Sequence, residues 1–363
     1  MANHSCIPNA TVLFAGRTAV LRAERPIGEG EEIEICYTDY TNPVSTRQSA
    51  LQQYNFTCRC RRCVDDLNVY QVCAQFFDGS GMTMFPDTWC SVVGRDASRL
   101  RHHPGASDPH RMQIAARFCA QPDPELGDSS SPDGRALLKK HLAGCAALMD
   151  NDLWAVAPLP QVLTEVSLCY VREQRYAYAV VVAAMVAVEC DPYRYAAPFH
   201  VVRLKNLLMV VKLLAWTAED AAALRGRGRG RGRRREQGRE PSLRGSVAAS
   251  RTGAAGHLES DIMETLGGMD QVSLSQMLLM MVLKAASPAE AALDQWSLGR
   301  QARELHDDIA ALDGRDKELS LIHAWRDDPE GEASRMFFEY AVVGQMAALA
   351  SLGKRVVSLE WHV

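Results

Sequence analysis

The chain has 363 residues, of which 47% are hydrophobic and 23% charged, and its formal net charge is −4. This balance is that of an ordinary globular protein, long enough for two domains. It excludes a protein that binds nucleic acid or an anionic membrane through its overall charge, so any basic function must be local.

The N-terminal sequence and the apolar runs bear on where the protein resides. Residues 1–4 lead straight into polar sequence, without the basic and apolar regions of a secretory signal. The longest apolar run, residues 176–188, is shorter than the roughly 20 residues of a membrane helix. We therefore expect a soluble protein of the nucleus, the cytoplasm or both, with no membrane contact.

Residues 11–38 alternate in the way that is typical of short strands. The runs 11–14 and 18–21 are β-prone and flank Gly16 and Arg17, which suit a tight turn. In residues 32–37, Ile33 and Ile35 would share one face of a further strand. Residues 47–54 can form a short helix that leads to a group of cysteines. The N-terminal part should be compact and strand-rich.

The eleven cysteines, in a chain without a secretory signal, favour reduced thiols or metal ligands over disulfides. Cys58, Cys60 and Cys63 form a C-x-C-x-x-C pattern, whereas six others are scattered and are interpreted as small buried apolar residues. Zinc needs four ligands, and this loop supplies three. A fourth must come from elsewhere in the chain, and Cys6 is the best-placed candidate.

The rest of the chain divides into two regions that differ in composition and in the spacing of apolar residues. Residues 65–134 are predicted to be a loop-rich connector with one helix near Met112, because Gly, Pro, Ser and Asp are frequent there. From about residue 135 the apolar spacing is helical. We expect helices over residues 160–174, 176–189, 199–216, 287–312 and 332–352. Ser287, Pro288 and Glu290 give the fourth a capped start, and Gly353 should end the last.

An arginine-rich segment interrupts the helical part. Arginine and glycine alternate from Arg225 towards Arg235, and glycine, serine and alanine follow. Such a segment cannot bury enough apolar surface to order itself, so residues 218–256 are predicted to be a disordered insertion. A solvated linker is the preferred interpretation. Weak contact with RNA or another polyanion at low salt is the alternative.

Three motifs in the N-terminal part resemble those of SET-type protein methyltransferases. Residues 3–9 read Asn-His-Ser-Cys-Ile-Pro-Asn, like the family's NHSCxPN motif. Residues 30–37 resemble the Gly-Glu-Glu strand that ends in the catalytic tyrosine, and residues 54–63 resemble the post-SET pattern Y-x-F-x-C-x-C-x-x-C. The Y-x-F element points to the SET-and-MYND branch and its fungal relatives. The resemblance covers residues 1–63.

The resemblance implies a protein-lysine N-methyltransferase that uses S-adenosylmethionine and acts on a histone or another protein. It assigns Tyr37 as the catalytic tyrosine, Asn3, His4 and Phe56 as cofactor contacts, Tyr54 as a wall of the lysine channel, and Cys6, Cys58, Cys60 and Cys63 as zinc ligands. Tyr40 is a second candidate for the role of Tyr37. Tyr37 is preferred because it ends the Gly-Glu-Glu strand without a shift.

These residue types suit methyl transfer to lysine. The amine must be neutral to attack, and an apolar aromatic channel disfavours the ammonium form of a group whose ordinary pKa is about 10.4. A phenol hydroxyl can orient the amine, and aromatic faces attract cationic methyl groups. The displacement also needs the reacting atoms to be aligned.

The expected fold class is α+β. Residues 1–64 would form the C-terminal half of a SET domain with its zinc-binding post-SET loop, followed by the connector 65–134 and a mostly helical, tetratricopeptide-like domain over residues 135–363. The family's N-terminal SET half has no counterpart here, so we expect a fragment that is inactive as it stands, in preference to a degenerate protein. The alternative function is a non-catalytic, zinc-stapled interaction scaffold, and a weaker one is an RNA-associated protein.

Overall fold

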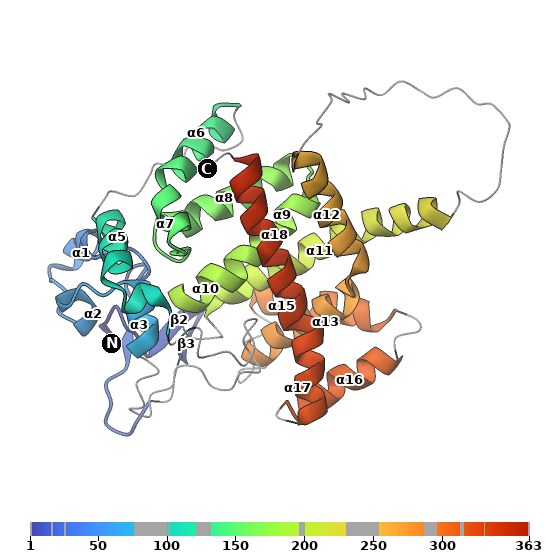
Figure 1. The fold of residues 1–363 in the computed structure, drawn as a ribbon. Helices are drawn as coiled ribbons and strands as arrows, with labels where there is room; N and C mark the ends of the chain where they lie inside the picture. The colour runs from blue at the N-terminus through green and yellow to red at the C-terminus, as the bar shows by residue number, and fades with distance from the viewer. Residues whose placement is uncertain are drawn as a thin grey trace.

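The computed structural model describes residues 2–75, 100–120, 132–195, 200–229, 254–286, 296–312, 316–329 and 331–361, apart from residues 16, 25, 26 and 101. Short strands and turns form an N-terminal lobe, residues 2–67, which lies at one end of a larger helical lobe, residues 68–361 (Figure 1). This arrangement confirms the α+β class with a mostly helical second part.

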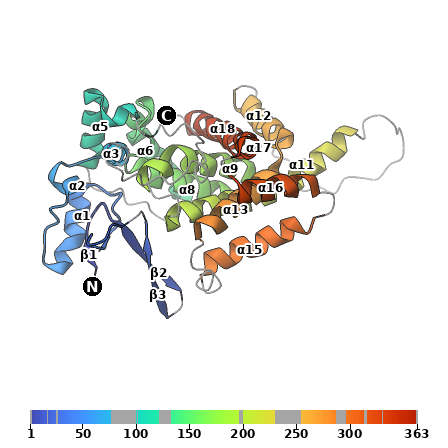
Figure 2. The same cartoon turned by 90° about the horizontal axis from the view of Figure 1, so that it is seen from below.

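The strands of the N-terminal lobe form two small sheets. Strand β1 (Asn3–His4) pairs in parallel with β4 (Glu34–Ile35), and β2 (Ala10–Ala15) pairs antiparallel with β3 (Thr18–Ala23). Ala15 lies opposite Thr18, so the predicted hairpin with its two-residue turn is confirmed. Figure 2 shows this hairpin projecting from the body of the molecule.

The strand expected over residues 32–37 is shorter than predicted, because β4 has two residues. The side chain of Asn9 accounts for this. Its amide donates to the carbonyl of Glu32 at 2.8 Å, and its carbonyl oxygen accepts from the backbone N–H of Glu34 at 2.8 Å. Backbone groups that would extend a ladder are thus bonded to a side chain.

Three short helical segments carry the chain from β4 to the helical lobe. They are α1 (Val44–Leu51), the 3-10 turn η1 (Gln52–Tyr54) and α2 (Arg61–Val64). Asn55 follows η1 with a φ of 57°, a left-handed conformation that asparagine tolerates, and it turns the chain towards the cysteines. The helix predicted over residues 47–54 is confirmed, three residues longer at its start.

Most of the described residues belong to the helical lobe. Its elements are α3 (Val69–Gln75), η3 (Pro104–Ala106), α5 (Pro109–Cys119), α6 (Pro132–Gly144), α7 (Ala146–Asp150), α8 (Leu159–Arg172), α9 (Tyr176–Met185), η4 (Val186–Cys190), α10 (Asp191–Arg194), α11 (Val201–Arg229), α12 (Ala254–Gly268), α13 (Gln271–Ala286), α15 (Ser297–Ala310), α16 (Asp316–Asp327), α17 (Glu332–Phe338), η5 (Glu339–Gly344) and α18 (Gln345–Glu360). Helix α9 is central, because α8, α11 and α18 all pack against it (Figure 1). Residues 178–185 of α9 are accordingly all buried.

The predicted helix end at Gly353 is wrong, since α18 continues to Glu360. Gly353 lies where α18 crosses α9. A Cβ atom at this position would stand 2.4 Å from the carbonyl oxygen of Val181 and 2.8 Å from the Cβ of Met185. The glycine therefore permits the close approach of two helices and does not serve as a cap.

The predicted connector and insertion also differ from the structure. The helix expected near Met112 is confirmed as α5, but α3 belongs to the main core as well, with Tyr70 fully buried, so the connector is not loop throughout. The disorder predicted for residues 218–256 is wrong at both ends, because α11 continues to Arg229 and α12 begins at Ala254. Residues 230–253 and the start predicted at Ser287 lie outside the described residues, and α15 begins at Ser297.

Two described helical stretches are long and apolar enough to cross a membrane by length and composition, Tyr176–Arg194 and Glu332–Glu360, and a bent pair, His257–Gly268 with Gln271–Leu283, would make a third. The sequence prediction that the first is too short is wrong, because η4 and α10 continue α9 to 19 residues. Of its most apolar window, 83% is buried inside the protein, against 50% for the second stretch. Packing in the helical core accounts for the apolar character of the first stretch.

Candidate metal centre and aromatic site

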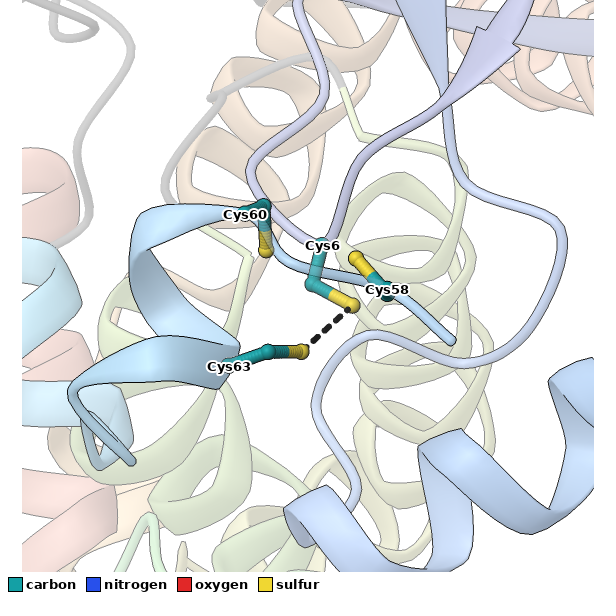
Figure 3. Close-up of side chains that lie close together, drawn as sticks. All are labelled: Cys6, Cys58, Cys60 and Cys63. Atoms are coloured by element: carbon teal, nitrogen blue, oxygen red, sulfur yellow. Dashed lines mark hydrogen bonds between the residues drawn. The ribbon is translucent and has the colours of Figure 1, made fainter. Parts of the chain in front are cut away.

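Four cysteines from two distant segments of the N-terminal lobe lie close together (Figure 3). Cys6 follows β1, Cys58 and Cys60 precede α2, and Cys63 lies within α2. The four sulfurs lie within 4.8 Å of one another, with 3.5 Å between those of Cys6 and Cys63. Zinc–sulfur bonds of about 2.3 Å in a tetrahedron place the sulfurs about 3.8 Å apart, so the cluster fits a zinc ion.

Helix α1 holds the cysteine loop in place through Gln48. Its side-chain amide donates to the carbonyl oxygen of Cys58 at 2.8 Å, and its carbonyl accepts from the N–H of Cys58 at 3.0 Å. The N–H groups of Cys63 and Val64 both donate to the carbonyl of Cys60, which closes the turn. The backbone around three of the four sulfurs is therefore fixed by hydrogen bonds.

Four sulfurs this close cannot all be negatively charged unless a cation lies between them. Hydrogen bonds with Cys36 and Cys60 raise the pKa of the Cys6 thiol, and the bond from Cys6 lowers the pKa of Cys60 to about 4. Burial raises the pKa of Cys58 to about 11. A divalent metal removes this conflict, because its charge stabilises every thiolate that binds it.

His4 links this cluster to Tyr37. The backbone N–H of Tyr37 donates to His4 Nδ1 at 3.1 Å, so the ring hydrogen of a neutral His4 lies on Nε2. His4 Nε2 is 3.3 Å from the sulfur of Cys6 and can donate to it. Such bonds from a neighbouring side chain orient metal ligands. The predicted cofactor residue His4 thereby also contacts one sulfur of the cysteine cluster.

Four of the predicted site residues form an aromatic cluster at the end of β4. The ring of Tyr37 is 5.0 Å from that of Tyr54, 5.3 Å from that of His4 and 6.4 Å from that of Phe56. The Tyr37 hydroxyl donates to the carbonyl of Ala2 at 2.6 Å. Tyr54 and Phe56 are 48% and 37% exposed, so the cluster is open on one side.

The fifth predicted residue, Asn3, lies beside His4 on β1. Its side chain is exposed and donates to the Glu32 carboxylate. The structure thus brings His4, Tyr37, Tyr54 and Phe56 together, and it places Asn3 at their edge.

The two candidate tyrosines lie in different surroundings. Tyr40 packs edge-on against Tyr195, at 6.2 Å, and against His200, at 5.6 Å, and both belong to the helical lobe. Tyr37 lies in the aromatic cluster next to the cysteines. Tyr37 thus lies beside the cysteines, whereas Tyr40 lies in the contact between the lobes.

Sequence reasoning missed three residues that shape this site. Asn9 was in the quoted NHSCxPN motif, so its role could have been sought there. Gln48 and Arg47 carry no signal, because polar residues on a short helix normally face solvent. Only the fold shows that both point to the cysteine loop, where the Arg47 side chain is 2% exposed.

Comparison with known proteins bears on the same segment. Residues 1–38 match the SET domain family model. The histone-lysine N-methyltransferase SMYD3 of Mus musculus is 45% identical over 64 residues, which are 17% of this chain and 15% of that protein. Residues 1–38 are thus similar to a SET domain, and the N-terminal segment is similar to proteins of the SET-and-MYND type.

Two further relatives agree with this assignment. A SET and MYND domain-containing protein of Dictyostelium discoideum is 43% identical over 67 residues, 18% of this chain and 20% of the relative. The histone-lysine N-methyltransferase ASHR1 of Arabidopsis thaliana is 45% identical over 62 residues, 17% and 13% of the two chains. The chain thus covers between 13 and 20% of the length of these relatives. The SET-and-MYND resemblance predicted from the three motifs is confirmed for this segment.

Proposed function

We propose that this protein is a SET-type protein-lysine N-methyltransferase that uses S-adenosylmethionine and holds one zinc ion on Cys6, Cys58, Cys60 and Cys63. The observation that carries the proposal is the position of Tyr37. It lies at the end of β4 among His4, Tyr54 and Phe56, and His4 joins it to the four-cysteine cluster.

The residues of the aromatic cluster match the needs of the reaction. S-adenosylmethionine supplies an activated methyl group. The Tyr37 hydroxyl donates to Ala2, so its oxygen keeps lone pairs that can accept from a lysine amine and orient it. The faces of Tyr54 and Phe56 exclude water on one side and disfavour the ammonium form of the lysine. Asn3, His4 and Phe56 are the residues placed to contact the cofactor.

The exposure of this site supports the expectation that the 363-residue chain alone is inactive. Tyr54 and Phe56 are partly exposed, and Phe14 and Leu21 on the neighbouring hairpin are 75% and 50% exposed. Isolated two-stranded sheets are marginally stable in water. Alignment of the methyl group with the amine needs a closed site, and a misplacement of about 1 Å can cost 10²-fold in rate. Further protein surface must therefore complete the site.

The substrate of the proposed enzyme is a lysine side chain of another protein. Relatives of the N-terminal segment are named histone-lysine N-methyltransferases, which makes a histone one candidate. We propose that the helical lobe, as a tetratricopeptide-like array, recruits this substrate, since helical arrays present extended binding surfaces. Such a role places the protein in the nucleus, the cytoplasm or both.

A non-catalytic scaffold is the second candidate function. The observation that favours it is the contrast between the open aromatic cluster and the extensive core of the helical lobe. In that case the zinc would stabilise the N-terminal lobe beside a helical lobe that binds a partner, and the aromatic cluster would not be catalytic.

Methyl transfer by the protein isolated from its source separates the two functions. Isotope-labelled S-adenosylmethionine is supplied with histones and with a source extract, and label on lysine is measured. The enzyme proposal expects transfer that falls by about 10²–10³-fold in Tyr37→Phe, with zinc content unchanged. The 363-residue chain produced alone should transfer nothing. Equal label transfer by Tyr37→Phe and the wild type would contradict the role of Tyr37. No transfer by the wild type would contradict the enzyme proposal and favour the scaffold function.

A further inference from the structure

The proposed zinc centre has a net charge that its cysteines cannot balance. Four thiolates around a divalent ion carry a net charge of −2. The centre is shielded from water on one side, since Cys6 and Cys58 are buried while Cys60 and Cys63 are partly buried. A buried net charge is unfavourable unless opposite charges lie close to it. The surroundings of the cysteines should therefore contain cations.

Two buried arginines lie on the helices next to the cysteine loop, and one of them contacts a sulfur. Arg47 lies on α1 and Arg62 on α2, and each is 2% exposed. Arg47 donates from Nη2 to the sulfur of Cys63 at 3.5 Å and from Nη1 to the carbonyl oxygen of Asn42. Among the described residues, no carboxylate lies within ion-pair distance of either guanidinium, and the Nε atom of each has no hydrogen-bond partner. Arginine is seldom buried in this way without an anion nearby.

We infer that Arg47 and Arg62 are the counter-charges of the zinc centre, and that Arg47 also positions Cys63 through an N–H···S hydrogen bond. The two guanidinium groups carry +2, which equals the excess of the four thiolates over the ion. The inference rests on the proposed zinc centre. It adds two residues, outside the ligand set, on which zinc affinity depends.

A cavity of about 140 Å³ beside the arginines offers a competing explanation. It lies between the cysteine loop and the helical lobe, and its walls include Arg47, Arg62, Asp65 and Asp66. A small anion bound there would also balance the arginines. The two aspartates on the wall disfavour an added anion, whereas the sulfur of Cys63 already accepts from Arg47. The contact of Arg47 with Cys63 therefore favours the thiolates over an added anion, and Arg62 is assigned to them by its place on α2 and the influence of Cys6 on its guanidinium.

Zinc affinity in matched variants of the full chain tests the inference. Arg47→Met and Arg62→Met keep the aliphatic stems and remove the charge, while Arg47→Lys and Arg62→Lys keep the charge. Arg61→Met is the control, because the Arg61 side chain is 66% exposed and pairs with Asp65 at the surface. Affinity is measured by competition with a chromophoric chelator at neutral pH, and folding by circular dichroism.

The inference predicts that each methionine variant weakens zinc binding by about 10- to 100-fold, the usual effect of losing a group that supports metal ligands. The lysine variants should retain most of the affinity, and Arg61→Met should change it less than about twofold, because water screens that charge. With cobalt(II) in place of zinc, the sulfur-to-cobalt absorption band should shift in Arg47→Met and stay in Arg61→Met, because only Arg47 donates to a ligand sulfur.

The outcomes separate the possible failures. A wild-type chain that binds no zinc would overturn the proposed metal centre itself. Wild-type zinc affinity in both methionine variants, or equal losses in the lysine and methionine variants, would overturn the counter-charge role and leave the centre intact. If a methionine variant does not fold, the matching lysine variant distinguishes the two roles. A role in packing alone predicts that the lysine variant also fails to fold. Stabilisation of the metal-free chain by inorganic phosphate, lost in Arg62→Met, would assign the arginines to an anion site instead.

Discussion

The two lobes are stabilised in different ways. In the helical lobe a single continuous apolar core runs through the described helices from α3 to α18, and most of its members are fully buried. Among the described residues of the N-terminal lobe, the buried apolar cluster is much smaller: Cys6, Leu51 and Cys58, with partly buried Tyr37, Tyr40, Cys60 and Cys63 packed on it. A core that small cannot offset the entropy of ordering about sixty residues. We therefore expect the N-terminal lobe to depend on the proposed metal and on contact with the helical lobe.

The contact between the lobes is polar and aromatic. Arg194 of α10 donates to the hydroxyl of Thr41 at 2.8 Å, and Tyr195 stacks on His200 at 4.4 Å beside Tyr40. Buried polar contacts of this kind fix a geometry but contribute modestly to stability, about 0.5–1.5 kcal/mol for a hydrogen bond. The difference between the two lobes therefore predicts that the N-terminal lobe can unfold while the helical lobe stays folded.

Loss of the metal should produce the largest difference in stability between the two lobes. Cys60→Ser removes one of four ligands from a centre of a kind that supplies on the order of 10 kcal/mol of folding free energy. Hydrogen exchange should show loss of protection in residues 2–67 and unchanged protection in α9 and α18. Cys145→Ser is the control, because Cys145 is a 2% exposed thiol of the helical lobe outside the cluster. Full protection of the N-terminal lobe after removal of zinc would contradict the comparison.

A change where α18 crosses α9 should destabilise the helical lobe and leave the N-terminal lobe unchanged. Gly353→Ala places a methyl group 2.4 Å from the Val181 carbonyl, so α18 and α9 must separate. Overpacking of this kind costs about 1–3 kcal/mol, which exceeds the gain of up to about 1 kcal/mol that alanine brings to a helix. Gly267→Ala in α12 is the control, because nothing lies within 4 Å of its Cβ position. Urea denaturation should show a loss for the first and a small gain for the second, with zinc content unchanged in both.

Local motifs predicted the N-terminal lobe well. The hairpin, the cysteine set and the aromatic group all follow from short patterns, because turns, ligand spacing and strand alternation are local properties. The patterns failed where a distant element decides the outcome. Gly353 has the sequence of a helix end, and only the neighbouring α9 explains why the helix continues.

The roles of buried polar residues were the least predictable part of the site. Arg47 has ordinary surface character in the sequence, the motif around Asn9 does not reveal what Asn9 binds, and their partners lie 16 and 25 residues away. The choice between Tyr37 and Tyr40 likewise needed the helical lobe, because His200 and Tyr195 are what surround Tyr40. Such roles depend on tertiary contacts, and no window of sequence contains both partners.

The effect that depends most on conditions concerns a carboxylate buried at the contact between the lobes. Glu24 is 1% exposed and lies 4.0 Å from His200. Burial, with a further contribution from Cys36, raises the pKa of Glu24 from 4.5 to about 7, although Arg22 acts in the opposite direction. Burial lowers the pKa of His200 to about 4, so the histidine is neutral and cannot compensate an ionised Glu24. A group whose pKa is raised on folding contributes stability at low pH and loses it as the pH rises through the folded value.

Glu24→Gln should therefore stabilise the N-terminal lobe in alkaline solution. The gain should be small near pH 5, grow as the pH approaches about 7 and level off above it, at roughly 3 kcal/mol. It arises because glutamine has the shape of the carboxyl group and no charge to bury. Urea denaturation of the N-terminal lobe between pH 5.5 and 8, with the exposed Glu29→Gln as control, measures this difference. A gain that is the same at both ends of this range would show that Glu24 is not protonated on folding, and a loss at pH 8 would show that its ionised form has a partner.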